Sequence, residues 1–174
     1  MTKHWQTTVF FVRHGETDAD YSLDRSLDSQ RQLTGFGRRQ LEAVGAYLEQ
    51  FGPSAIYSSP LDRCLESARL IIEQLSQKPS LRTEQSLIEI YGHQPKSLAE
   101  NQGGTFLDLA IKRHPGEQVV AVTHQYIIGH LVAEFTGQLY HQVECDFAAV
   151  YRFVLADSTL VEVTHLRPAA KIGQ

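Results

Sequence analysis

The stretch VFFVRHG, residues 9–15, decides the fold. Its first four residues are all apolar and are β-branched or aromatic, which is typical of a strand covered on both faces. Arg13 and His14 follow at once, where such a strand ends. The stretch therefore predicts a buried strand that delivers polar side chains to one edge of a sheet.

The rest of the chain alternates strand-like and helix-like segments. Further strands are expected at residues 54–58, at the start of 81–90, at 118–123, and as a closing pair at 147–155 and 159–165. Helices are expected from a Thr34 cap to Gly52-Pro53, from a Ser59 cap to Lys78-Pro79, at 105–113 and at 126–135. This order predicts a three-layer α/β/α sandwich with a mostly parallel central sheet. The length of 174 residues predicts a single domain over 1–174.

Composition excludes several classes of partner. The chain has 16 Lys and Arg against 20 Asp and Glu, a net charge of −4, which disfavours nucleic acid and acidic membrane surfaces. No apolar run approaches the roughly 20 residues of a membrane span, and the first residues have no apolar core of a signal peptide. Cys64 and Cys145 are too few for a disulfide scaffold and are expected to be buried thiols. We therefore expect a cytoplasmic protein; its oligomeric state leaves no signal in the sequence.

Four potentially cationic residues are expected to meet at the carboxyl ends of the strands. Arg13 and His14 follow the first strand, Arg63 lies in the first turn of the helix after the second, and His124 ends the strand at 118–123. Ligands bind at this edge of open α/β sheets. Two arginines and the starts of two helices favour an anion such as phosphate. Histidine adds a nucleophile that is neutral near pH 7 and can accept a phosphoryl group.

Phosphoryl transfer also needs an acid to protonate the departing oxygen. Glu84, Glu89 and Glu100 all precede the strand at 118–123, and position alone does not choose among them. Considered one at a time, Arg63, His124 and Glu89 also fit ordinary structural roles. Arg63 fits a surface arginine paired with Glu66 or Asp62, His124 a hydrogen-bonded core histidine, and Glu89 a solvated carboxylate.

Taken together, the motifs resemble the histidine phosphatase superfamily, the phosphoglycerate mutase-like enzymes, and within it the small phosphatase branch. The matching blocks come in the family's order between Val9 and about Val132. They are RHGET at 13–17, LTGFGRRQ at 33–40, SSPLDR at 58–63, LIEI at 87–90 with Gly92, and VTH at 122–124. The first and third blocks are the specific ones, and the block around Glu89 is weaker.

The resemblance implies roles for five residues. His14 is the nucleophile that becomes a phosphohistidine; Arg13, Arg63 and His124 hold the phosphate oxygens and stabilise the transition state; and Glu89 is the proton donor. It implies a phosphatase that uses neither a metal nor an organic cofactor. The substrate is a phosphorylated small molecule or a phosphoprotein, such as one carrying phosphohistidine. The histidines also lack metal-ligand spacing such as H-E-x-x-H.

The chain departs from the family pattern at several positions. Asp20 stands where Asn is frequent and Gln125 where Gly is common, so both are expected to contact substrate. The run at 91–95 lacks the usual Trp-Glu-Gly, and only the 34 residues from 90 to 123 separate Glu89 from His124. We expect a short lid and an open site, which suits hydrolysis better than mutase chemistry, because a mutase must keep water from its intermediate. A phosphoglycerate-type mutase and a non-catalytic phosphate-binding or scaffold protein are the alternatives.

Overall fold

A six-stranded sheet is built by the residues that the structure, a computed structural model, describes: 5–18, 25–91 and 96–172. Its order is β3-β2-β4-β1-β5-β6. The strands are β1 (Gln6–Arg13), β2 (Ala55–Ser58), β3 (Leu81–Thr83), β4 (Gln118–Thr123), β5 (Val150–Ala156) and β6 (Thr159–Leu166). The strands β1 to β4 are parallel, and β5 and β6 continue the sheet antiparallel. The mostly parallel sheet expected from the sequence is confirmed.

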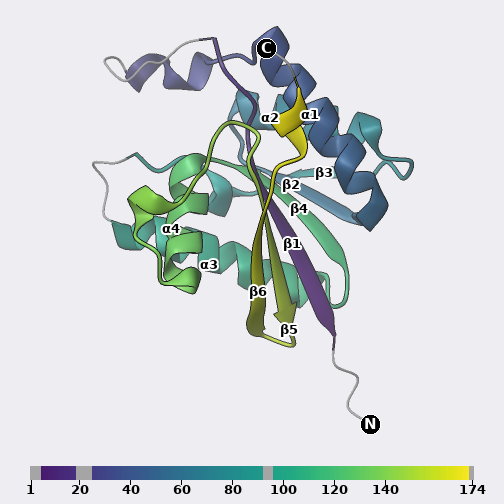
Figure 1. Cartoon of the computed structure of the whole chain (residues 1–174), viewed down its shortest axis with the longest axis vertical. Helices are drawn as coiled ribbons and strands as arrows, with labels where there is room; N and C mark the ends of the chain where they lie inside the picture. Colours follow the sequence, from purple (N-terminus) through teal and green to yellow (C-terminus); the bar gives the residue numbers. More distant parts are fainter. Residues whose placement is uncertain (1–4, 19–24, 92–95, 173–174) are drawn as a thin grey trace.

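Helices cover both faces of the sheet, as Figure 1 shows. Those on one face are α1 (Gly35–Leu48) and α2 (Asp62–Gln74), and those on the other are α3 (Lys96–Arg113) and α4 (Gln125–Thr136). The three-layer α/β/α sandwich is therefore confirmed. Of the described helices, none combines the length and apolar composition that crossing a bilayer requires.

The central strand β1 is buried on both sides, as its sequence predicts. Phe11 faces the α3–α4 layer and lies edge-on to Phe106, with ring centroids 5.7 Å apart. Phe10 faces the α1–α2 layer and contacts Phe51. Because β1 pairs with β4 on one side and β5 on the other, the residue after it sits near the middle of the sheet edge. That residue is His14.

Two helices differ from their expected bounds. The helix α2 begins at Asp62 instead of directly after Ser59, and it ends at Gln74, four residues before Lys78. The Lys78 ammonium donates to the carbonyls of Ile72 and Glu73, so it satisfies that helix end from outside the helix. The helix α3 begins at Lys96, nine residues earlier than expected. Its two central glycines do not end it, because α3 packs closely against α4 there.

The strand β5 begins at Val150, three residues later than expected. The backbone N–H of Ala149 donates to the carbonyl of Asp146, and Ala148 has a φ of +59°, so residues 146–149 form a tight turn instead of extended chain. This turn carries Phe147 to the sheet edge where β1 ends. The Thr34 cap was expected correctly: its hydroxyl accepts from the backbone N–H of Gly37 at 2.9 Å.

Candidate active site

The strand register brings the predicted residues to one place. Arg13 at the end of β1 pairs with Thr123 at the end of β4, so the next residues, His14 and His124, emerge side by side. Their ring centroids lie 5.3 Å apart. Arg63, the second residue of α2, has its guanidinium 3.4 Å from His124. Glu89 completes the cluster, with a carboxylate oxygen 3.3 Å from the same histidine.

His14 is fixed in position and in tautomer. Its backbone N–H donates to the Thr123 carbonyl, and its own carbonyl accepts from Ala148. In the side chain, Nδ1 lies 2.9 Å from the carbonyl oxygen of Gly15. A carbonyl oxygen only accepts, so Nδ1 carries the proton and Nε2 holds the lone pair. Burial lowers the pKa of His14 well below its ordinary value, and the charges of Arg63 and Arg13 lower it further, so the ring is neutral and the lone pair of Nε2 is unprotonated.

Gly15 is required by a backbone-to-backbone contact beside His14. A Cβ placed on it would lie 2.6 Å from the carbonyl oxygen of Gly37 and 2.3 Å from a methyl of Leu41, both in α1. Gly37 meets the backbone of Glu16 equally closely. The start of α1 is thus packed directly against the segment after His14, which leaves no room for side chains between them.

We expect Gly15→Ala to lower the free energy of unfolding by about 1–3 kcal/mol, because the added methyl group overpacks this contact. Thermal or urea denaturation measures the loss. Gly104→Ala is the matched control, since a Cβ there meets nothing within 4 Å and alanine favours a helix interior. An unchanged stability of Gly15→Ala would show that α1 is not held against the His14 segment in this way.

The two arginines are held from outside the cluster. Arg13 donates from Nη1 to the carbonyl of Cys145 at 2.7 Å, and its guanidinium lies 4.1 Å from the centre of the Phe147 ring. Arg63 donates from Nη1 to the backbone carbonyl of Asp28 and from Nη2 to its carboxylate, each at 2.9 Å. Both side chains are therefore positioned before any ligand arrives.

Each of these two arginines has one N–H donor that is not used in the hydrogen bonds above. In the described part of the chain, the Nε atoms of Arg13 and Arg63 are buried without a hydrogen-bond partner. Burying an unsatisfied guanidinium N–H is costly, so such groups are usually paired. The positive charges of Arg13 and Arg63 both lower the pKa of His14, so both guanidinium groups lie close to it. Their unpaired Nε–H donors are suited to bind the oxygens of a phosphate.

Glu89 is suited to act as an acid. One carboxylate oxygen, Oε1, accepts from the backbone N–H of Ile90 at 3.0 Å, while Oε2 lies 3.3 Å from Nδ1 of His124 and 3.8 Å from Arg63. Burial raises the pKa of Glu89 to about 7, although the charge of Arg63 opposes the rise. A carboxyl with this pKa holds a proton for much of the time at neutral pH and can give it away.

The side chain of His124 is fully buried. Its Nε2 lies 2.8 Å from the hydroxyl of Ser59 and 3.5 Å from the buried sulfur of Cys64. Burial lowers the pKa of His124 well below its ordinary value, with His14 and Arg63 as further causes. The expectation that Ser59 caps α2 is wrong: the cap position is Leu61, and the Ser59 hydroxyl faces the site. Burial likewise raises the pKa of the Cys64 thiol, so it stays protonated, and the side chain packs in the core beside α1 and α2.

Three further residues of the site were not expected from the sequence. Asp28 lies in the 3-10 helix η1 (Arg25–Gln30) and binds Arg63, and Tyr91 donates to the same carboxylate at 2.8 Å. Phe147 packs on Arg13 and lies 5.6 Å from the His14 ring, between centroids. No motif marks these positions. Ser59, which also lies in the site, does carry a signal, because it directly follows the end of β2, as His14 follows β1 and His124 follows β4.

Other candidates fall elsewhere. The carboxylate of Glu84 caps the short helix η3 (Gln85–Leu87) by accepting from Ser86, so it is occupied there. Asp20 and the side chain of Glu100 lie outside the described residues. Gln125 is exposed as the first residue of α4. Arg63 pairs with Asp28 instead of Glu66 or Asp62. Across 5–18, 25–91 and 96–172, no group of three or more His, Cys, Asp or Glu is placed to hold a metal ion.

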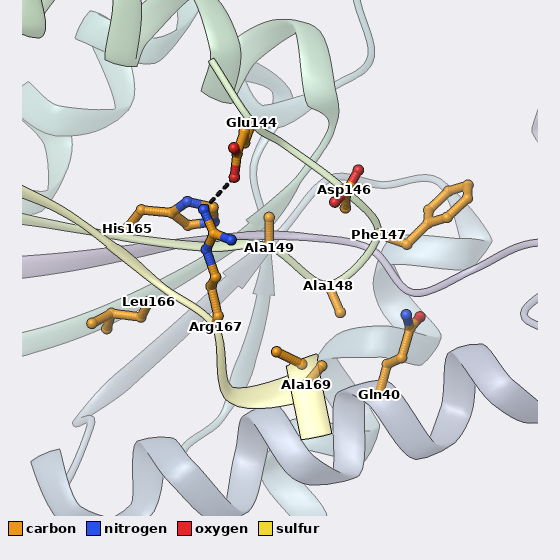
Figure 2. A pocket seen from close by; sticks show the side chains of 11 residues that line it. Gln40, Glu144, Asp146, Phe147, Ala148, Ala149, His165, Leu166, Arg167 and Ala169 are labelled. Carbon is orange, nitrogen blue, oxygen red and sulfur yellow. Dashed lines mark hydrogen bonds and ion pairs between the residues drawn. The ribbon is translucent and has the colours of Figure 1, made fainter. Parts of the chain in front are cut away.

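A separate cavity of about 220 Å³ adjoins the turn that carries Phe147 (Figure 2). Its wall includes Gln40 and the ion pair of Glu144 with Arg167, drawn as a dashed line. His14, Arg63, Glu89 and His124 are not among its lining residues. The chemistry described above therefore belongs to the strand ends and not to this hollow.

A family model matches the sequence over residues 9–102, which include His14, Arg63 and Glu89. It describes the histidine phosphatase superfamily, branch 1. The chain belongs to this superfamily. The resemblance drawn from the sequence motifs is thereby confirmed. Membership of this superfamily indicates that the protein is an enzyme that acts on phosphate esters.

Two relatives share part of the sequence. The uncharacterized phosphatase PhoE of Bacillus subtilis is 36% identical over 69 residues, which are 40% of this chain and 36% of that protein. The 2,3-bisphosphoglycerate-dependent phosphoglycerate mutase of Thermoplasma acidophilum is 35% identical over 84 residues, 47% of this chain and 40% of that protein. The matched segments thus span well under half of each relative, so neither relative's activity carries over directly.

Solved structures share the whole fold at low sequence identity. A phosphoglycerate mutase from Bacillus anthracis has a TM-score of 0.80 at 17% identity and covers 98% of both chains. A phosphoserine phosphatase mutant from Entamoeba histolytica, in complex with phosphoserine, has a TM-score of 0.73 at 15% identity over 94% of this chain and 98% of its own. The protein histidine phosphatase SixA, complexed with tungstate, scores 0.69 at 20% identity over 92% and 97%. The superfamily member therefore has a phosphoglycerate mutase-like fold.

Proposed function

We propose that this histidine phosphatase superfamily member hydrolyses phosphomonoesters through a phosphohistidine formed on His14. The observation that carries the proposal is the state of His14: Nδ1 is bound to the Gly15 carbonyl, so Nε2 is free to attack. The charges of Arg13 and Arg63 act on this ring, and their buried Nε donors have no hydrogen-bond partner among the described residues. Glu89, an acid with a raised pKa, belongs to the same cluster. A simple anion-binding site would need the arginines but neither the oriented histidine nor the acid.

In the proposed reaction, Nε2 of His14 attacks phosphorus and the bond to the ester oxygen breaks. Arg13, Arg63 and His124 hold the three remaining phosphoryl oxygens as charge moves among them. Glu89 gives its proton to the departing oxygen, which leaves as an alcohol. Water then attacks the phosphohistidine; its proton passes to the Glu89 carboxylate, the phosphorus–nitrogen bond breaks, and phosphate is released. Each residue ends the cycle as it began, and no step calls on a metal or an organic cofactor.

The proposal keeps one domain over residues 1–174, in the cytoplasm, where the two buried free thiols remain reduced. Its substrate is a phosphorylated small molecule or a phosphoprotein.

Hydrolysis is favoured over the mutase alternative by the chain between Glu89 and His124. Most of that chain forms α3, which packs on the sheet and α4, so little is left to cover the site. Asp20 and Gln125 remain proposed substrate contacts.

A release assay tests the proposed function. Purified protein is incubated with para-nitrophenyl phosphate, a panel of phosphorylated metabolites including phosphoserine and 3-phosphoglycerate, and a protein carrying phosphohistidine. Phosphate release from some of these substrates is expected. Folded protein that releases phosphate from none of them, yet binds inorganic phosphate, would indicate the non-catalytic alternative. Faster isomerisation than hydrolysis of 3-phosphoglycerate would indicate a mutase.

We expect kcat/KM to fall as the pH rises above about 7, because Glu89 must hold its proton to act as the acid. One ionisation gives a loss of about tenfold per pH unit on the alkaline side. No corresponding loss is expected near pH 6.5 from His14, because burial keeps its pKa well below that value and the ring stays neutral.

The pH profile of Glu89→Gln provides the control. The phosphomonoester itself titrates near a pKa of about 6, and its effect on kcat/KM is the same for both proteins. The fall of kcat/KM above about pH 7 that is due to Glu89, the alkaline limb of the profile, disappears in the variant. If wild type and Glu89→Gln show the same alkaline limb, Glu89 is not the acid.

A further inference from the structure

Asp28 is the centre of a hydrogen-bond cluster at the edge of the site. Its side chain is only 9% exposed, and its Oδ2 accepts from Arg63 at 2.9 Å and from the Tyr91 hydroxyl at 2.8 Å. The other oxygen accepts from Arg31 at 3.3 Å. Burial raises the pKa of Asp28, but these hydrogen bonds and charges outweigh it and leave the pKa below its usual value. The residue is therefore an anion in the folded protein.

The contacts with Arg63 occupy one particular edge of its guanidinium. The backbone carbonyl of Asp28 accepts from Nη1 and the carboxylate from Nη2, so Asp28 binds the end of the planar group. The Nε donor, on the side edge, has no partner within the described residues. A guanidinium can bind one oxyanion end-on and a second through its side edge. Asp28 thus fixes the arginine and leaves the edge that a phosphoryl group needs.

Tyr91 joins a second element to the same carboxylate. It lies two residues after Glu89, in the segment that follows η3. Its hydroxyl bond to Asp28 ties the segment bearing the acid to the helix η1, which in turn holds Arg63 on α2. Three parts of the chain that are far apart in sequence are therefore locked together through a single side chain.

We propose that Asp28 is a positioning residue for the reaction: it aims the side edge of Arg63 at the phosphoryl group and, through Tyr91, keeps the Glu89 segment beside that arginine. This inference rests on the proposed function, because it assigns Arg63 and Glu89 their roles in phosphoryl transfer. Asp28 itself touches neither the nucleophile nor the leaving group.

The charge of Asp28 also bears on Glu89. The groups around Glu89 are Arg63 from α2, His124 at the start of α4, Arg13 from β1 and Asp28 from η1. Of these, Asp28 is the anion that helps to keep Glu89 protonated. Removing it leaves the charge of Arg63 uncompensated, so the Glu89 proton is lost at lower pH. A residue with a merely structural role would not move this ionisation.

The test compares Asp28→Asn and Tyr91→Phe with wild type on the best substrate of the release assay. Binding of inorganic phosphate by calorimetry is measured alongside. We expect Asp28→Asn to lower kcat/KM roughly 10- to 100-fold, as for loss of a hydrogen bond to a charged group. Phosphate should bind correspondingly more weakly, and the alkaline limb of the pH profile should shift to lower pH. Tyr91→Phe should show a smaller loss of kcat/KM and should leave the alkaline limb in place, because Asp28 keeps its charge in that variant. Asp108→Asn, an exposed aspartate on α3, is the control.

The outcomes separate this inference from the proposed function. Wild type without turnover would reject the phosphatase, while weaker phosphate binding by Asp28→Asn would still support positioning of Arg63. If Asp28→Asn matches Asp108→Asn in rate, binding and pH profile, the inference is wrong. It is also wrong if Asp28→Asn binds phosphate more tightly, since Asp28 would then be competing with the ligand. Should Asp28→Asn fail to fold, Tyr91→Phe decides: a folded Tyr91→Phe protein with wild-type kcat/KM and wild-type affinity for inorganic phosphate would overturn the inference.

Discussion

Replacing His14 by alanine is expected to lower kcat by at least roughly 10⁴-fold while the protein stays folded. The reason is that in the proposed mechanism Nε2 of His14 is the atom that forms the bond to phosphorus, and the described side chains around it do not offer a substitute. His124 is enclosed by Ser59, Cys64 and Glu89, and the pKa of Cys64 is raised by burial, so neither is an alternative nucleophile. Steady-state release of phosphate measures the loss.

The control for this substitution is His141→Ala, because His141 is exposed in the 3-10 helix η4 (Tyr140–Gln142), outside the candidate site. It should keep the wild-type rate. Binding of inorganic phosphate by His14→Ala should persist, since Arg13 and Arg63 remain. A His14→Ala protein that keeps more than a few per cent of wild-type turnover would exclude a phosphohistidine at this position.

The second large effect is expected from Glu89→Gln, and its size should depend on the leaving group. The quantity to compare is kcat/KM, which reports the transfer to His14 and not the later attack of water on the phosphohistidine. With an alkyl phosphate, whose departing oxygen is strongly basic, kcat/KM should fall by roughly 10²- to 10⁴-fold. With para-nitrophenyl phosphate the loss should be about tenfold or less, because the nitrophenolate leaves without needing a proton. The comparison isolates proton donation from other roles of the side chain.

Glu42→Gln, an exposed position of α1, gives the same chemical change away from the site and should be silent. Equal losses of Glu89→Gln on both substrates would show that Glu89 holds the site together without donating a proton. A loss confined to para-nitrophenyl phosphate would contradict the mechanism outright, because that substrate needs the acid least.

The fold could be predicted from the sequence because its signals are local. The apolar run before Arg13 needs cover on two faces, and the alternation of such runs with helical periodicity leaves few arrangements. The strand order then follows from packing, and it brings His14 next to His124. Boundaries were less predictable. Lys78 caps α2 from a distance, and the close approach of α3 to α4 accommodates glycines that would otherwise suggest a break.

The candidate site could be predicted only as far as residues follow strand ends. Arg13, His14 and His124 do so, and Arg63 lies one turn beyond. Asp28 and Tyr91 do not, because their roles depend on a contact between the 3-10 helix η1 and the segment after η3, which no periodicity encodes. Ser59 was assigned to a helix cap on local chemistry, yet tertiary packing turned its hydroxyl toward His124. The side chains missed by sequence reasoning are thus those that contact Arg63 and His124, namely Asp28 and Ser59, and Tyr91, which binds Asp28.

The most direct test of the account is to trap the intermediate. Wild type and His14→Ala are mixed briefly with a ³²P-labelled substrate identified in the release assay, quenched in alkali and digested, and the labelled peptide is located by mass spectrometry. The account predicts an acid-labile, alkali-stable label on the peptide that contains His14, formed within the time of one turnover and absent from His14→Ala. Label on another residue, or rapid turnover of wild type with no labelled protein at any quench time, would contradict it.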